Sequence, residues 1–151
     1  MIKYLNNGIK KMQNQAALLR IMHEKRLLEM NYEHSFVRCT LVSKENTHKL
    51  VCHVYYMLMD ENIHFRIVYD GRLHPRAWIV SPKIEDPQHI YSDDKSLCLY
   101  DPKTDEWSSE KNIYNTFVPW CQQWIVFQRL YEQTGKWQHP ERHPATGIEK
   151  N

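Results

Sequence analysis

Cys98 is the residue of this chain with the best position for nucleophilic chemistry. It lies in the stretch 96–102, between a polar turn at 92–95 and a predicted helix that begins near Ser109. A cysteine attacks as its thiolate, which requires a site that does not bury the side chain in apolar surroundings. A junction between a turn and a helix supplies exposure, so we predict that Cys98 carries covalent catalysis. The alternative is a plain buried cysteine, because free thiols are often found in protein cores.

Polar side chains close to Cys98 in the sequence could assist it. His89 is the natural proton carrier, because histidine is the side chain whose ordinary pKa lies near neutrality. The other candidates share polar side chains that could stabilise or move a proton: Tyr91, Asp93, Asp94 and, farther along the chain, His143. Each also has a purely structural interpretation. His89 could form a structural hydrogen bond within the loop, and Tyr91, Asp93 and Asp94 could be turn residues. His143 could belong to an exposed tail.

The spacing of cysteines and histidines gives little support to a metal site. No two of the four cysteines form a Cys-x-x-Cys pair, which excludes a zinc ribbon and a thioredoxin motif. A zinc set of Cys98 with His89, His139 and His143 matches no known ligand spacing. The other cysteines have positions typical of core residues, in predicted strands or on an apolar helix face: Cys39, Cys52 and Cys121. We therefore expect neither a metal nor a cofactor.

The composition is that of an ordinary globular chain. Its 151 residues suffice for one domain with one core, and its net charge is only +2. The densest basic run, Lys10-Lys11, is too short for the concentrated stripe by which proteins bind nucleic acid. The first residues lack the apolar segment of a signal peptide, and no run approaches the ~18 apolar residues of a membrane span. Reduced thiols in the cytoplasm are therefore expected.

The elements that must position Cys98 begin with a helix and a run of strands. Residues 8–30 have apolar side chains at near-helical spacing, which predicts an amphipathic helix packed on a sheet. The apolar positions expected to pack there are Ile9, Met12, Ala16, Leu19, Met22 and, less regularly, Leu27 and Leu28. Alternating apolar and polar residues predict strands at 35–44, 49–59, 63–68 and 76–81. Short turns between them favour an antiparallel meander. Residues 82–97 have no sustained period, and such long irregular segments are often functional.

A second helix is predicted after the cysteine. Aromatic and apolar residues recur at steps of three or four, which predicts a helix near 109–133 with a serine cap and an apolar face. Pro119 predicts a kink or a break within this helix, because proline cannot donate a backbone hydrogen bond. Gly135 predicts its end. The tail at 136–151 is expected to be irregular.

The order of these elements resembles the ubiquitin-conjugating (E2) fold, which has a helix, a four-strand meander, an active-site loop and further helices. Members of that family carry a histidine shortly before the active cysteine, a leucine after it and a tryptophan ahead of the next helix. Here His89, Leu99 and Trp107 have those positions. The resemblance implies an α+β fold of one E2-like domain with its core at about 8–135, and it implies that Cys98 and His89 are the catalytic residues.

The finer resemblance is to the E2-like proteins of bacterial CBASS antiphage operons. The shared elements are Leu-Cys-Leu-Tyr at 97–100, a Trp and a Tyr-Glu pair within 124–132, and Thr-Gly-x-Trp at 134–137 followed by a later histidine. This resemblance implies that Cys98 accepts, as a thioester, the C-terminal carboxyl of a cGAS-like nucleotidyltransferase in the bacterial cytoplasm. It implies the short form of the operon, without a fused activating enzyme. A homodimer is a further option, and neither a membrane nor a nucleic acid is an expected partner.

One departure from the family leaves the reaction open. Eukaryotic members have His-Pro-Asn, whose asparagine supports attack by lysine, whereas this chain has His89-Ile90-Tyr91. Either another group takes that role, or the acceptor is a small molecule or water. The alternative function is a catalytically silent E2 variant that regulates the nucleotidyltransferase by complex formation, although the retained cysteine argues against it. A small nucleic-acid binder is the third hypothesis.

Overall fold

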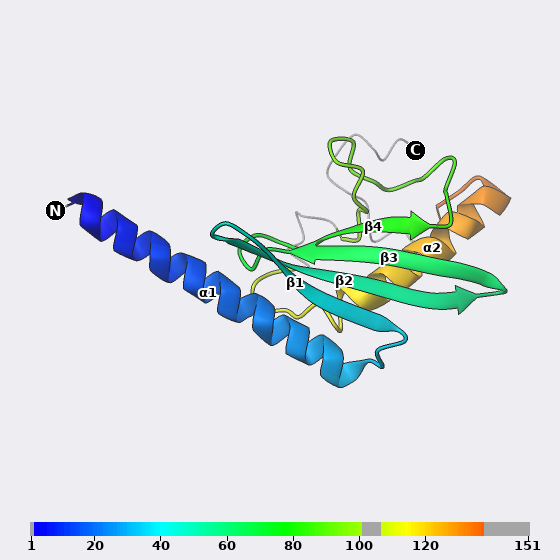
Figure 1. Cartoon of the computed structure of the whole chain (residues 1–151). Coiled ribbons are helices and arrows are strands. Elements are labelled where there is room, and N and C mark those ends of the chain that lie inside the picture. The colour runs from blue at the N-terminus through cyan, green and yellow to red at the C-terminus, as the bar shows by residue number, and fades with distance from the viewer. Residues whose placement is uncertain (1, 101–106, 138–151) are drawn as a thin grey trace.

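The computed structural model of the chain describes residues 2–100 and 107–137. Within these ranges it has two helices and four strands, and α2 lies behind the sheet in the view of Figure 1. In chain order the elements are α1 (Ile2–Asn31), β1 (Val37–Lys44), β2 (Thr47–Leu58), β3 (Glu61–Tyr69), β4 (Arg76–Ser81) and α2 (Phe117–Thr134). This confirms the predicted α+β class, and the arrangement is compatible with an E2-like fold.

The four strands form one antiparallel sheet in the order β1-β2-β3-β4, which confirms the predicted meander. Strand alternation decides which side chains enter the core, and on β2 these are Leu50, Cys52 and Val54, all fully buried. Cys39 of β1 faces Cys52 directly, and their sulfur atoms lie 3.5 Å apart. Together with the buried Cys121 of α2, these two thiols belong to the core, as predicted.

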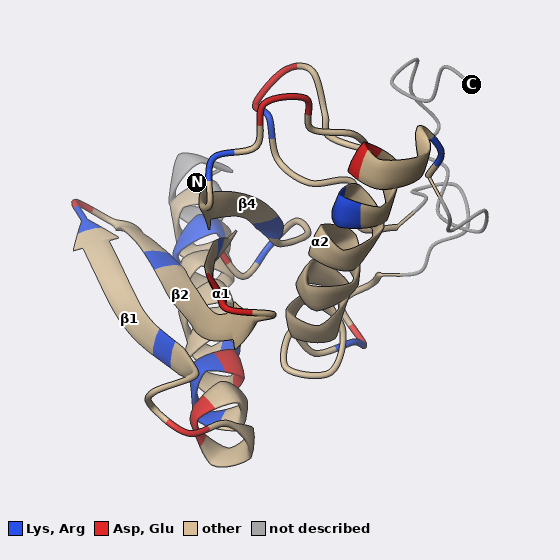
Figure 2. Cartoon of the chain, turned by 90° about the vertical axis from the view of Figure 1, so that its right-hand side faces the viewer, with Lys and Arg blue, Asp and Glu red and all other residues tan. Residues whose placement is uncertain are grey.

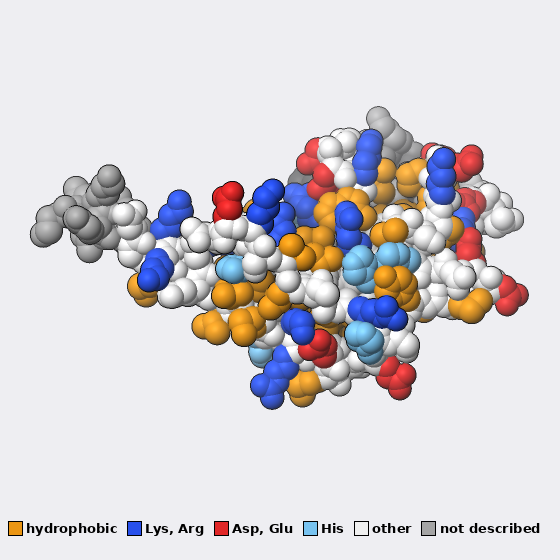
Figure 3. Space-filling model, viewed as in Figure 1, with side chains coloured by type: hydrophobic (Ala, Val, Ile, Leu, Met, Phe, Trp, Pro, Cys, Tyr) orange, Lys and Arg blue, Asp and Glu red, His pale blue; other side chains and the backbone are white. Residues whose placement is uncertain are grey.

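The predicted buried face of the first helix is wrong. Most of its apolar positions are exposed, with Ile9 at 53%, Met12 at 69% and Leu19 at 67%. The helix packs on the sheet through a face that begins at Ala17 and includes Ile21 and Leu28, and of these three residues only Leu28 was among the predicted positions. Its N-terminal half extends beyond the sheet in Figure 1, and apolar side chains lie along its surface in Figure 3. The exposed stripe therefore has no part in the core.

A buried polar pair fixes α1 to the segment that precedes α2. Glu24 is fully buried, and its carboxylate accepts hydrogen bonds from Arg20 Nε at 3.1 Å and from the backbone N–H of Ile113 at 2.9 Å. The two remaining guanidinium nitrogens of Arg20 donate to the carbonyl oxygens of Ser109 and Lys111. The inward face of α1 thus contains a charged pair as well as apolar residues, which hydrophobic periodicity does not detect.

The second helix begins later than predicted. Residues 109–111 and 114–116 are turns and bends, and α2 starts at Phe117 with Thr116 at its N-cap position. Pro119 therefore lies in the first turn, where the backbone N–H groups have no intrahelical acceptor, and the predicted kink or break is wrong. Gly135 ends the helix in a left-handed conformation, and its N–H donates to the carbonyl of Tyr131, which confirms the predicted end.

Gly71, in the connection from β3 to β4, lies directly against α1. Its φ is +85°, a conformation that favours glycine. A Cβ atom on this residue would come within 2.4 Å of the carbonyl oxygen of Ala17. The connection can therefore approach the helix backbone this closely only because residue 71 has no side chain.

Charged residues occur along both helices and the sheet, as Figure 2 shows. One group of acidic residues lies in the connection between β4 and α2, where Glu85, Asp86, Asp93 and Asp94 occur. Neither helix, over the residues that the structure describes, is long and apolar enough to cross a lipid bilayer.

Candidate active site

The connection between β4 and α2 contains a short antiparallel bridge that fixes Cys98 next to β4. Ile90 and Leu97 form this bridge, which pairs the residues around His89 with those around Cys98. The Cys98 N–H donates to the carbonyl of His89 at 2.8 Å, and the Leu97 N–H donates to the carbonyl of Ala77 on β4 at 2.8 Å. The segment predicted as irregular is thus partly ordered, and we refer to residues 89–98 as the cysteine hairpin.

Asp94 fastens the tip of the cysteine hairpin to β4. One of its carboxylate oxygens accepts from the backbone N–H and the hydroxyl of Ser96, at 2.9 and 2.7 Å. The other accepts from Arg76 at 2.6 Å, and its carbonyl accepts from the indole N–H of Trp78 at 2.9 Å. Burial raises the pKa of the Asp94 carboxyl, but the hydrogen bonds from Ser96 and the charge of Arg76 lower it by more. The net effect is a pKa below the ordinary value of aspartate. These contacts give Asp94 a structural role.

Replacing Asp94 with alanine should lower the free energy of unfolding by about 1–2 kcal/mol, because the partly exposed carboxylate holds two segments together. Asp93→Ala is the matched control, since the exposed Asp93 accepts from the backbone N–H of Asp94; it should cost about 0.5 kcal/mol. A lowered pKa means that this contribution is present above the ordinary pKa of aspartate and is lost as the pH falls. Urea unfolding near pH 7 and near pH 3 measures both effects. Equal stabilities of the two variants near pH 7 would contradict this role.

The other end of the loop is held on α2 by Gln128. This side chain is fully buried, accepts from the backbone N–H of Gln88 at 2.9 Å and donates to the carbonyl of Asp86 at 3.0 Å. The indole N–H of Trp124 donates to the carbonyl of Gln88 at 3.1 Å. The backbone entering the cysteine hairpin is therefore attached to one face of α2.

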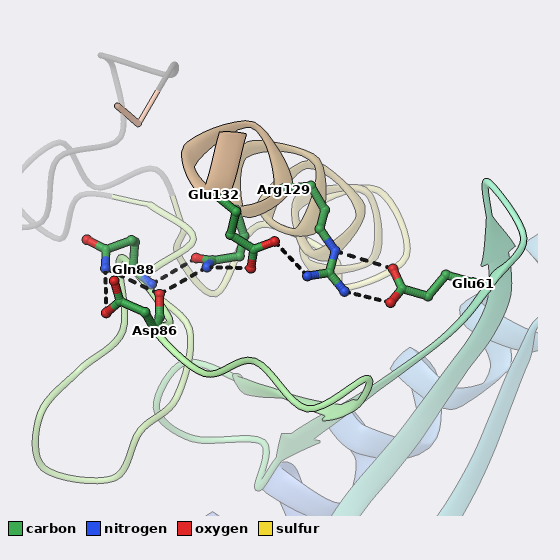
Figure 4. Close-up of polar contacts among 6 residues, drawn as sticks. Glu61, Asp86, Gln88, Arg129 and Glu132 are labelled. Atoms are coloured by element: carbon green, nitrogen blue, oxygen red, sulfur yellow. Dashed lines mark hydrogen bonds and ion pairs between the residues drawn. The ribbon is translucent and has the colours of Figure 1, made fainter. Parts of the chain in front are cut away.

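A second group of polar contacts ties the same part of α2 to the sheet. Arg129 pairs with Glu132 one turn along the helix at 2.7 Å and with Glu61 at the start of β3 at 2.6 Å. Figure 4 shows these residues as a continuous line of contacts from the loop at Asp86 and Gln88 across α2 to β3. The loop, the helix and the sheet are thus connected on this side of the molecule.

The expected exposure of Cys98 is wrong for this conformation. The residue is only 3% exposed. Burial raises the pKa of its thiol to about 12, the hydrogen bond from Tyr91 opposes this, and the negative charges of Asp94 and Asp93 add to it. The thiol is therefore protonated at neutral pH in the structure as it stands, and the sequence could not show this because the covering residues lie far along the chain.

His89 approaches Cys98 through its backbone. Its φ is +52°, its side chain is 4% exposed, and its ring stacks on the ring of Trp137 with centroids 4.3 Å apart. The carbonyl of the same residue accepts the Cys98 N–H. The structure therefore places Cys98 close to Tyr91 and to the His89 backbone, while His143 lies outside the described residues.

Aromatic residues of α2 and the segment after it enclose the cysteine. A pocket of about 10 Å³ adjoins Cys98, which is room for about one water molecule. Its walls are Cys98, Leu99, Trp120, Gln123, Trp124, Phe127 and Trp137. The sequence pointed to Trp137 only as part of the Thr-Gly-x-Trp element, and gave no sign that it reaches the cysteine.

The part of the chain that the structure describes brings together no group of three or more His, Cys, Asp or Glu side chains that could hold a metal ion. Of the zinc set considered above, His139 and His143 lie outside the described residues. His89 and Cys98 do lie in one hairpin, but their connection is the backbone hydrogen bond.

Comparison with known proteins gives one family. No curated protein matches the chain significantly. The model of the family described as Type II CBASS E2 protein matches residues 24–144, which include the whole sheet, the cysteine hairpin and α2. This match extends over most of the 151 residues. The chain therefore belongs to the Type II CBASS E2 family.

Proposed function

We propose that this protein is an E2-like transferase that forms a thioester between Cys98 and the C-terminal carboxyl of a protein partner. The partner would be the cGAS-like nucleotidyltransferase of its antiphage operon. The observation that carries the proposal is the position of Cys98 in a family of E2 proteins: it lies in the loop between β4 and α2, whereas the other three cysteines lie in the sheet and in α2. His89 is proposed as the assisting residue because it is paired with Cys98 in the same hairpin.

The proposed step needs an activated donor. The thiol of Cys98 loses its proton, the sulfur attacks the acyl carbon, a C–S bond forms, and the bond from that carbon to its leaving group breaks. A free carboxylate is too poor an electrophile, so the donor must arrive as a thioester or an acyl adenylate made by a separate activating protein.

Tyr91 is a candidate for the role of the absent asparagine. Burial and the neighbouring Cys98 raise the pKa of its hydroxyl, so this group stays protonated and can donate. Its hydrogen bond favours the thiolate form of Cys98. A donor so close to the sulfur is suitably placed to stabilise the oxyanion that develops when the sulfur attacks a carbonyl carbon.

The test is intact mass without reductant after the chain is mixed with the operon's nucleotidyltransferase, whose C-terminal carboxyl is supplied as a thioester so that the donor is already activated. The wild-type chain should give a covalent adduct that reductant removes, Cys98→Ala should give none, and Cys98→Ser should give a longer-lived ester. Cys39→Ala is the matched control, because it removes another buried thiol and should retain the adduct. An adduct that persists in Cys98→Ala would refute the assignment.

A binding module without catalysis is the second candidate, and the burial of Cys98 favours it. In that case the chain would regulate the nucleotidyltransferase by forming a complex. The same experiment separates the two functions: a stable complex of unmodified masses in wild type and in both Cys98 variants would establish the binding module.

A further inference from the structure

We propose that Trp137 is an intramolecular plug, which occupies the slot beside Cys98 that the C-terminal end of the acyl donor must enter. The inference rests on the proposed function and names the regulation of its site. It says that the transferase is closed when it is alone, and that displacement of Trp137 opens it.

The indole ring of Trp137 is held by aromatic rings from two parts of the fold. It stacks on His89 of the cysteine hairpin at 4.3 Å with 21° between the ring planes. It also lies against Trp124 and Phe127 of α2, at centroid distances of 6.3 and 5.9 Å. The ring thus bridges the hairpin that carries Cys98 and the helix that faces it.

The space beneath this ring is too small for catalysis. The pocket next to Cys98 has about 10 Å³, whereas even the carbonyl group of a donor needs more room than a single water molecule. A reacting acyl carbon must come within about 3–3.5 Å of the sulfur. One wall of the pocket must therefore move before Cys98 can form a thioester.

Trp137 is the wall that can move with the least disturbance. Trp124 is 2% exposed on a helix whose neighbouring residue Ile125 is fully buried, so α2 cannot shift without opening the core. Cys98 itself is anchored through the backbone of the hairpin. Trp137, in contrast, follows Gly135, where the helix has already ended at a φ of +76°, and it remains partly exposed.

The closed position also leaves a polar atom unsatisfied. The indole N–H of Trp137 is buried and finds no hydrogen-bond partner within residues 2–100 and 107–137. A buried donor without an acceptor is unfavourable, and the N–H regains a partner when the ring moves into water. The unpaired N–H therefore offsets part of the stacking energy of the closed state and lowers the free energy needed to open it.

The slot that Trp137 vacates suits an extended polypeptide end. Its remaining walls are the aromatic rings of Trp120, Trp124 and Phe127, with the exposed amide of Gln123 at the rim. Aromatic walls accept the flat peptide groups of an extended chain, and a rim amide can hydrogen-bond to its backbone.

The test is the rate at which iodoacetamide alkylates Cys98 in the folded full-length chain, followed peptide by peptide by mass spectrometry. If the open state is a minor one, Trp137→Ala should raise this rate about tenfold or more, because it removes the plug. Trp137→Leu, which keeps part of the apolar volume, should give an intermediate increase. Lys136→Ala is the matched control and should stay within about twofold of wild type.

Cys121 provides the control for folding, because it is fully buried and should stay unmodified in every variant. If Trp137→Ala exposes Cys121 as well, the comparison is made with Trp137→Leu. An unchanged Cys98 rate with Cys121 protected would overturn the plug. Thioester formation is scored separately: faster alkylation without any thioester keeps the plug and refutes the transferase, whereas a thioester with unchanged alkylation refutes the plug alone.

Discussion

Replacing Arg20 with methionine should lower the free energy of unfolding by about 3–5 kcal/mol, because it leaves the buried carboxylate of Glu24 without its counter-charge. Glu24 is fully buried and Arg20 is one-fifth exposed, so water cannot replace the lost partner. The guanidinium also lies over the rings of Tyr69 and Trp107, at 5.6 and 5.9 Å. Its removal therefore weakens the attachment of α1 to both the sheet and the segment before α2. Urea unfolding followed by circular dichroism measures the effect.

The same helix offers a matched control for this prediction. Lys25 and Glu29 form a pair with the same spacing, but its side chains are 30% and 48% exposed. Lys25→Met should therefore cost only about 0.3–0.5 kcal/mol. Adding Glu24→Gln to Arg20→Met should recover about half of the lost stability, because no buried charge remains. Equal losses in Arg20→Met and Lys25→Met would show that Glu24 has no special dependence on Arg20.

Alkylation of Cys98 in the folded wild-type chain near pH 8 should be about a thousandfold slower than that of an ordinary exposed thiol. The reason is that burial moves its pKa from 9.0 to about 12, and only the thiolate reacts. The rate should keep rising about tenfold per pH unit above pH 9, where an exposed thiol levels off. Pulse alkylation at several pH values, with the same peptide in urea as the reference, gives both curves. A plateau below pH 9 in the folded chain would show that the thiolate is stabilised.

The sign of the accompanying stability change follows from the same pKa. The unfolded chain releases the Cys98 proton near pH 9, whereas the folded chain keeps it until about pH 12. The stabilisation from this group is therefore complete below pH 9 and is lost as the pH rises above it, by about 1.4 kcal/mol per pH unit. Above pH 9, the free energy of unfolding should fall less steeply with pH in Cys98→Ala than in the wild-type chain. An identical pH dependence in the two proteins would contradict the raised pKa of Cys98.

The sheet was the most predictable part of the fold. Strand alternation along β2 places Leu50, Cys52 and Val54 on one face, and the structure buries all three. The first two turns between strands are short. Glu45 in the first turn and Met59 and Asp60 in the second have the positive φ values that tight hairpin turns require. Local patterning therefore determined the strands and their connections.

The helices were less predictable because long-range contacts decide their details. Many apolar positions of α1 are exposed, and its packed face contains a polar pair, Arg20 with Glu24, that apolar spacing does not detect. Apolar spacing suggested that the helix around Pro119 begins near 109. The segment before Phe117 instead forms turns whose backbone carbonyls bind Arg20. Arg20 and the carbonyl groups that it binds lie far apart in the sequence.

The candidate site shows the same limit. The sequence associated His89 with Cys98 as catalytic residues, and this role stays a prediction. The structure joins the two residues through a backbone hydrogen bond in one hairpin. It wrongly suggested that the thiol is exposed, because the aromatic cover comes from Trp124, Phe127 and Trp137, which follow it in the chain. Exposure depends on what folds over a residue, and a local pattern contains no information about such a cover.

The contact between Gly71 and Ala17 has a consequence for sequence variation among related chains. A side chain at position 71 would push against the helix backbone one turn before Arg20, and so would displace the guanidinium from the segment that it binds. Substitution at this turn is therefore coupled to the polar pair on α1. In a relative without glycine at this position, we expect the connection and the first helix to lie farther apart than they do here.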